Sequence, residues 1–301
     1  MTAKIISVFL AGWMALIFSA GAQDNQLTDA QIQDLAKGLH YQQGQIKIQD
    51  SLATLDVPTN FYYLNAQDAK TVLVKLWGNP PSQVEDTLGL LMPSNVTPLD
   101  PACWAVIISY ANDGYVKDDD ASKINYDDLL KKMQAGTREN NKARTDKGYP
   151  AMELVGWATP PHYDAATHKL YWAKELKIEG ASEDTLNYDI RILGRHGVLV
   201  LTAVAGMTQL PEIEKQTPGI LSMVNFDQGN RYADFDPKVD KVATYGIAAL
   251  VAGGIAAKLG LFKLIWVFIL AAKKFIIIGL AAIAAWFKKL FGRQKTPPPT
   301  A

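Results

Sequence analysis

The sequence predicts an α+β fold, a mainly antiparallel sheet with packed helices, followed by C-terminal membrane helices. Two observations predict this class. Segments with helical spacing and segments with strand composition occur in separate blocks, and no β-α-β alternation of convincing length is visible. In addition, residues 242–291 contain no acidic side chain and are apolar except for a few lysines. This composition is typical of membrane-embedded segments.

Four segments have the apolar spacing of amphipathic helices. Three of them follow a residue whose side-chain oxygen can accept a hydrogen bond from a free N–H at a helix start, namely Thr28, Asn65 and Asn125. The predicted helices cover residues 29–39, 66–77, 126–144 and 210–224.

The predicted strands are rich in β-branched and aromatic residues. They cover residues 104–110, 153–157, 169–175, 187–193 and 198–204, and residues 55–63 are also expected to be extended. The last four strands are separated by turn sequences, including Pro160-Pro161, without an intervening helix, so we predict an antiparallel meander. Neither a repeat nor a linker divides residues 23–240, which we predict to be one α+β domain.

Residues 1–22 have the three parts of a secretion signal. Lys4 precedes an apolar run over residues 5–18, and the small residues 19–22 follow it. We predict cleavage before Gln23. The alternative is a retained N-terminal anchor, but the run is shorter than the roughly 20 residues that cross a bilayer.

Residues 241–291 are predicted to form membrane-anchor helices, and 292–301 a basic, proline-rich, disordered tail. Ala249, Gly253 and Ala257 recur at four-residue spacing, a stripe that allows helices to pack closely in lipid. Because lysines interrupt the apolar runs, helices lying in the membrane interface are an alternative. A soluble helical hairpin is another, although the segment offers almost no polar face.

Charge is distributed unevenly along the chain. All 30 acidic residues lie between Asp24 and Asp240, whereas eight lysines and arginines and no acid follow Lys241. An acidic domain joined to a basic apolar tail predicts the lipid bilayer as a partner, with other membrane or envelope proteins as further candidates. It argues against nucleic acid, which requires a basic surface. We expect the protein to be located at the inner membrane, with its folded domain on the extracytoplasmic side and its C-terminus in the cytoplasm.

The densest acidic cluster is a candidate cation site. Asp113, Asp118, Asp119 and Asp120 could supply the oxygen ligands that Ca²⁺ prefers. The spacing lacks the alternating ligands of an EF-hand, so a solvated turn with helix capping is the simpler interpretation.

Three further side chains are candidates for ligand or metal binding. His162 and Asp164 have the chemistry of zinc sites and of acid–base pairs, although their spacing matches no established ligand motif and Asp164 suits a turn. Arg195 could bind an anion, although a hairpin turn is the simpler explanation. Nucleophile-elbow, phosphate-loop and dinucleotide motifs are absent, so we predict no catalytic residue, metal or cofactor. The single cysteine, Cys103, is expected to be a buried thiol.

Several phrases, among them Trp104-Ala-Val-Ile-Ile-Ser-Tyr110, Gly114-Tyr-Val-Lys-Asp-Asp-Asp-Ala121 and Leu170-Tyr-Trp-Ala173, occur in a characteristic order over residues 104–260. In these the chain resembles a bacterial family of uncharacterised membrane-anchored proteins. The resemblance implies a signal peptide, an extracytoplasmic domain and a membrane anchor, and it implies no activity or site residue. We therefore expect a binding or scaffolding component of the cell envelope. The alternatives are an unrecognised envelope hydrolase and a small-ligand sensor.

Overall fold

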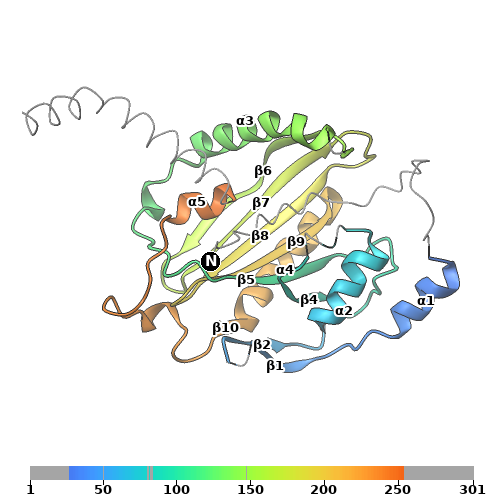
Figure 1. Ribbon diagram of the computed structural model, residues 1–301, viewed down its shortest axis with the longest axis horizontal. Helices are drawn as coiled ribbons and strands as arrows, with labels where there is room; N and C mark the ends of the chain where they lie inside the picture. The colour runs from blue at the N-terminus through green and yellow to red at the C-terminus, as the bar shows by residue number, and fades with distance from the viewer. Residues whose placement is uncertain (1–26, 50, 80, 82–83, 147, 254–301) are drawn as a thin grey trace, which may run out of the picture. The chain divides into compact units, whose positions relative to one another are not determined.

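The structure is a computed structural model that describes residues 27–49, 51–79, 81, 84–146 and 148–253 (Figure 1). The chain divides after Gly254 into two units, and the described residues all belong to the first. The predicted signal peptide, most of the predicted anchor and the predicted tail lie outside the described residues.

The fold is α+β, with antiparallel sheets and packed helices, as predicted. The larger sheet has the strand order β3 (Phe61–Asn65), β4 (Thr87–Pro93), β5 (Ala105–Ala111), β9 (Val198–Gly206), β8 (Thr185–Leu193), β7 (Lys169–Ile178) and β6 (Met152–Asp164). The smaller sheet has the order β1 (Gly44–Ile48), β2 (Ala53–Val57) and β10 (Val224–Phe226). The predicted meander is confirmed, because β6, β7, β8 and β9 pair antiparallel in sequence order.

The helices are α1 (Asp29–Lys37), α2 (Ala66–Lys70), the π-helix η1 (Thr71–Leu76), α3 (Tyr126–Thr145), α4 (Leu210–Met223) and α5 (Ile247–Ala252). Short 3₁₀ turns cover Ala121–Lys123 (η3), Met207–Gln209 (η4) and Tyr232–Asp234 (η5). All three predicted helix caps are confirmed: the side chains of Thr28, Asn65 and Asn125 accept backbone N–H groups at the starts of α1, α2 and α3.

The turn predicted at Pro160-Pro161 is wrong. Strand β6 continues through both prolines to Asp164. Proline cannot donate a ladder hydrogen bond, but β6 is the edge strand of the larger sheet and pairs on one side only, where its register shifts near the prolines. The strands β1, β4 and the short β10 were not predicted from the sequence.

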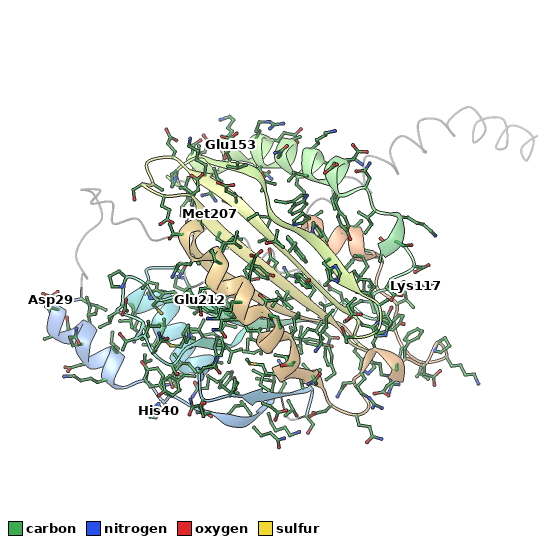
Figure 2. The ribbon with its side chains drawn as sticks, turned by 180° about the vertical axis from the view of Figure 1, so that it is seen from behind. Asp29, His40, Lys117, Glu153, Met207 and Glu212 are labelled. Atoms are coloured by element: carbon green, nitrogen blue, oxygen red, sulfur yellow. The ribbon has the colours of Figure 1, made fainter. Side chains whose placement is uncertain are left out.

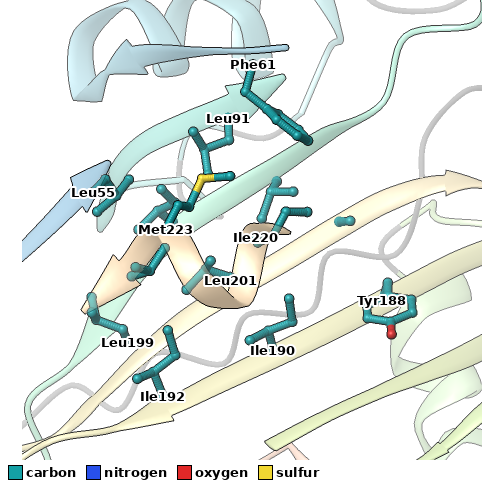
Figure 3. Close-up of a cluster of buried hydrophobic side chains, with 14 of the residues drawn as sticks. Leu55, Phe61, Leu91, Tyr188, Ile190, Ile192, Leu199, Leu201, Ile220 and Met223 are labelled. Carbon is teal, nitrogen blue, oxygen red and sulfur yellow. The ribbon is translucent and has the colours of Figure 1, made fainter. Parts of the chain in front are cut away.

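One face of the larger sheet packs against α4, and we call it the α4 face (Figure 2). Its core contains residues from both sheets and from the helix, among them Ile220 and Met223 of α4 and Leu199 and Leu201 of β9 (Figure 3). These four side chains are at most 3% exposed, so the face is a closed hydrophobic core.

The opposite face is covered in separate places, and we call it the groove face. α2 and η1 pack over β4 and β5 through Val72 and Leu73, whereas α3 packs over β6 and β7. α5 covers the end of β7 to β9 at which Leu170 and Val198 lie. The central strands lie between these helices (Figure 1).

The chain after Asp240 continues into this unit. Val242 forms a parallel bridge with Tyr115, and α5 buries Ile247, Leu250 and Val251 against the groove face. The folded unit therefore extends past the predicted boundary at residue 240, because the first apolar residues of the predicted anchor complete the core. In the part of the chain that the structure describes, no helix is both long and apolar enough to cross a membrane.

Candidate functional site

Polar side chains occupy the middle of the groove face, where core residues are expected. On β8, Asn187, Asp189 and Arg191 alternate with apolar residues that face α4. The register places Asp189 opposite Trp172 on β7 and opposite Thr202 on β9. Strand alternation and pairing thus assemble a polar group from three neighbouring strands.

Asp189 is the centre of this group and is 3% exposed. Its carboxylate lies 2.8 Å from Nζ of Lys174 and 3.1 Å from a guanidinium nitrogen of Arg191, and it accepts a 2.9 Å hydrogen bond from the Thr202 hydroxyl. Burial opposes ionisation, but the two cations outweigh it and lower the pKa of Asp189. The carboxylate is therefore charged, and the three ionised groups carry +1 +1 −1 = +1.

The neighbouring indole, Trp172, is 1% exposed. The guanidinium of Arg191 lies 5.0 Å from the centre of its ring, and Nζ of Lys174 lies 6.0 Å from it. Its Nε1–H has no hydrogen-bond partner among the described residues. A buried donor without an acceptor costs about 1–3 kcal/mol.

A cavity of about 350 Å³ adjoins this polar group. Its floor includes Ala105, Ile107 and Val204, which the register places beside Asn187 and Thr202 of the polar group. Its wall on the helix side is formed by Leu73 and Trp77. We call this cavity the groove; its volume falls within the range of small-molecule sites.

The outer end of the groove is acidic. Glu179, Glu183 and Asp184 line it at the turn between β7 and β8, and both glutamates are exposed. Glu183 also accepts the backbone N–H of Thr208 at 3.0 Å. The groove thus has an apolar floor and an acidic, solvated end.

Cys103 also lines the groove and is buried, as predicted. Burial raises the pKa of its thiol to about 12, so it remains protonated near neutral pH. A protonated thiol is a weak nucleophile, which makes Cys103 part of the apolar wall.

The sequence candidates lie elsewhere, and most of them hold the structure together. Asp118 accepts a 2.6 Å hydrogen bond from the Tyr163 hydroxyl and lies 3.5 Å from Nδ1 of His168. Burial raises the pKa of Asp118, but hydrogen bonds from Tyr163 and Tyr232 outweigh that effect and lower it. Asp113 accepts a 2.6 Å hydrogen bond from the Tyr245 hydroxyl.

The next two aspartates differ from each other. Asp119 is exposed, and the structure gives it no hydrogen bond within the described ranges. Asp120 accepts the backbone N–H groups of Ile247 and Ala248 at 3.0 and 3.2 Å, so it caps α5 from a distant part of the chain. This contact agrees with the helix capping that the sequence favoured for the acidic cluster.

The three other polar candidates also have structural partners. His162 is exposed beside the ring of Tyr171, and Asp164 accepts hydrogen bonds from Ala166 and Thr167 in the β6–β7 turn. Arg195 forms a two-point ion pair with Asp240 at 2.7 and 3.2 Å. In the predicted anchor stripe, Ala249 is half-buried on α5, Gly253 is its exposed left-handed C-cap, and Ala257 lies outside the described residues.

Over residues 27–253, apart from the few that are not described, no group of three His, Cys, Asp or Glu side chains could hold a metal ion.

The polar group around Asp189 was not predicted from the sequence. Its signal was present in the alternation of Asn187, Asp189 and Arg191 along one strand, but such alternation ordinarily indicates a solvent-facing side.

Residues 40–284 match the model of the family described as "Protein of unknown function (DUF2167)". A search of curated proteins gave no match.

The solved structures that the chain matches share little sequence with it. The PsbP protein of Synechocystis sp. PCC 6803 is 9% identical, with a TM-score of 0.33 over 62% of this chain and 92% of that one. The Ran-binding protein Mog1p of Saccharomyces cerevisiae is 9% identical, with a TM-score of 0.32 over 66% of this chain and 100% of that one. A protein of unknown function from Pseudomonas aeruginosa, PA94, is 15% identical, with a TM-score of 0.27 over 60% and 94%. Likeness at this level carries no functional argument.

Proposed function

The chain belongs to the DUF2167 family of proteins of unknown function, and from this premise we propose that it is a membrane-attached, extracytoplasmic binding protein of the bacterial envelope. The observation that carries the binding role is the groove, a cavity of about 350 Å³ with an apolar floor and polar side chains, among them Glu183 and Asp184, at its outer end. Concave, mainly apolar sites with a few polar groups are typical of small-molecule binding.

Binding is favoured over catalysis because most of the candidate polar side chains are held by structural partners. Arg195 is paired with Asp240, Asp164 is held within its turn, and Asp120 caps α5. The thiol that lines the groove is protonated near neutral pH. A hydrolase would need an activated nucleophile or a free base in reach of its substrate.

The membrane attachment rests on the two ends of the sequence. Residues 1–22 have the pattern of a secretion signal, and the apolar, basic segment that follows the folded unit suits lipid and a cytoplasmic C-terminus. α5 supports this arrangement, because it ties the chain that leads into this segment to the groove face.

The binding role is tested with a variant that fills the groove. Thr185 lines the groove on β8 and is half-buried, so Thr185→Trp inserts a large ring into the cavity. The full chain is purified from membranes, and its co-purifying small molecules are identified by mass spectrometry. We expect a compound bound to the unmodified chain in near-stoichiometric amount and lost from Thr185→Trp.

The matched control is Thr159→Trp. Thr159 is also a half-buried strand residue, but it lies on β6 opposite Ala173, a core residue of the α4 face. This control should retain the compound. A chain that carries no compound, or one that carries it equally in both variants, would refute binding in the groove.

The membrane placement is tested with reporter fusions after Gly253, near Lys273 and after Lys295. An extracytoplasmic reporter should be active after Gly253 and inactive after Lys295. Recovery of the full chain in the soluble fraction after lysis without detergent would contradict the attachment.

A further inference from the structure

The loop between η5 and α5, residues 236–242, exposes apolar side chains. Val239 is 74% exposed and Val242 is 38% exposed. Among the described residues, four large hydrophobic side chains are exposed, and this loop contributes two of them. A single exposed apolar residue needs no explanation, but two that lie three positions apart in one loop form a local apolar surface.

The charged side chains of this loop fall into two groups. The Asp240 side chain is 4% exposed and lies 2.7 Å from the guanidinium of Arg195, and Asp236 accepts the backbone N–H of Lys238 at 2.9 Å. Lys238 and Lys241 are exposed, and neither forms an ion pair within the described ranges. The carboxylates therefore hold the loop together, whereas both ammonium groups are free. Because Arg195 offsets Asp240 and one lysine offsets Asp236, one positive charge remains.

The chain on both sides of the loop tip is fixed to the folded unit. The ring of Phe235 stacks on that of Tyr115 with their centres 3.9 Å apart, and Tyr115 stacks on Tyr232 at 4.3 Å. On the other side, Ala243 donates its backbone N–H to the carbonyl of Tyr115 at 2.8 Å. The exposure of Val239 is therefore imposed by the fold.

The loop also lies where the chain leaves the folded unit. The ion pair with Arg195 holds it at the turn between β8 and β9, and α5 covers the same end of the sheet, where Val198 and Leu170 lie (Figure 1). α5 ends at Gly253, and the apolar, basic stretch follows it in the sequence. The end of the unit that carries the exposed valines is thus the end from which the proposed membrane segment continues.

From these observations, and on the basis of the membrane attachment proposed above, we infer that residues 236–242 are a contact surface for the phospholipid headgroup layer. Val239 enters the boundary between headgroups and acyl chains, and Lys238 and Lys241 contact lipid phosphates. Apolar side chains beside lysines suit this boundary, because the apolar part leaves water while the charge stays among the phosphates.

The test places a fluorescent probe on an introduced cysteine of the full chain in nanodiscs of phosphatidylcholine and phosphatidylglycerol. Val239→Cys carries the probe on the loop. The matched control is Val155→Cys, because Val155 is also an exposed valine, at 41%, but lies on β6. The unmodified chain reports background labelling of the buried Cys103. A nitroxide attached to the lipid near its headgroup should quench the probe at position 239 severalfold more than the probe at 155, and aqueous iodide should do the reverse.

The two lysines are tested in the Val239→Cys chain. Lys238→Glu combined with Lys241→Glu should lower quenching by the lipid nitroxide to about half or less, because anionic lipid then repels the loop. The matched control combines Lys75→Glu with Lys177→Glu, which reverses two exposed lysines on η1 and β7, and should leave the quenching unchanged.

Three outcomes would overturn the lipid contact while the membrane attachment stands. The first is equal quenching by iodide at positions 239 and 155 in chain that has entered nanodiscs. The second is a probe at 239 that neither quencher reaches, which would show that protein covers the loop. The third is an equal effect of the two double lysine variants. If the full chain does not enter nanodiscs, the attachment fails and the lipid contact fails with it.

Discussion

At the scale of single residues, the acidic segment after Asp113 shows how similar side chains acquire different roles. Asp118 is held by the Tyr163 hydroxyl, Asp120 caps α5, and Asp119 between them is exposed. Successive residues point in different directions, so three adjacent carboxylates cannot converge on one cation without a special backbone. Their neighbours from distant parts of the chain decide what each one does.

Replacement of Asp120 should weaken the attachment of α5. Asp120→Ala leaves the N–H groups of Ile247 and Ala248 without their acceptor, and loss of a cap costs about 1 kcal/mol. Urea unfolding of the full chain measures the change. Asp119→Ala is the matched control and should stay within about 0.5 kcal/mol of the unmodified chain; equal losses in both variants would contradict the capping role.

Asp118 should make stability depend on acid. Its pKa in the folded chain is below its ordinary value of 3.8, so its stabilising contribution is present above 3.8 and is lost as pH falls through the lower folded pKa. Asp118→Asn cannot ionise, so its unfolding free energy should fall less steeply over that acidic range. Unfolding titrations at a series of pH values test this, with Asp119→Asn as control, and identical slopes for all three chains would refute it.

At the scale of elements, the two faces of β8 serve different purposes. Tyr188 and Ile190 contribute to the closed core against α4, whereas Asp189 and Arg191 meet Lys174 across the β7–β8 pair. Burying ions between strands is rarely the most stable solution, and hydrophobic residues of similar size often replace such groups without loss. None of these three side chains lines the groove, so the ion group belongs to the sheet and not to the wall of the cavity.

Asp189→Asn should be strongly destabilising. It leaves the Lys174 and Arg191 cations together without a counter-charge, and removal of one partner from a buried ion pair costs about 3–5 kcal/mol. The double variant Asp189→Asn with Lys174→Met leaves one cation and should recover part of that loss. The unfolding free energies of the two variants are compared. A double variant that is less stable than Asp189→Asn alone would contradict the prediction that unpaired positive charge causes the loss.

At the scale of the whole molecule, the folded unit reaches beyond the boundary that charge and hydropathy predict. Ile247 and Val251 are fully buried in the same core as Trp172, and Val242 pairs with Tyr115. The segment is apolar because it packs against protein at least as far as α5. Hydropathy alone does not distinguish burial in a protein core from burial in lipid.

Truncation separates these two environments. A chain of residues 23–240 lacks α5, whereas a chain of residues 23–253 keeps it. Full burial of one large aliphatic side chain contributes about 1.5–3 kcal/mol, so the shorter chain should be less stable by several kcal/mol. Thermal unfolding of the two chains measures this, and equal transition temperatures would show that α5 does not complete the fold.

Local signals in the sequence determined much of this structure. Capping residues such as Thr28 and Asn125, together with apolar spacing, predicted most helices and the strands of the meander, because caps and periodicity act over a few neighbouring residues. Only the tertiary structure decided which side of β8 is buried, where Asp120 finds its partner, and that β6 can run through two prolines at the sheet edge. Those outcomes depend on contacts between residues far apart in the chain, and no local pattern specifies them.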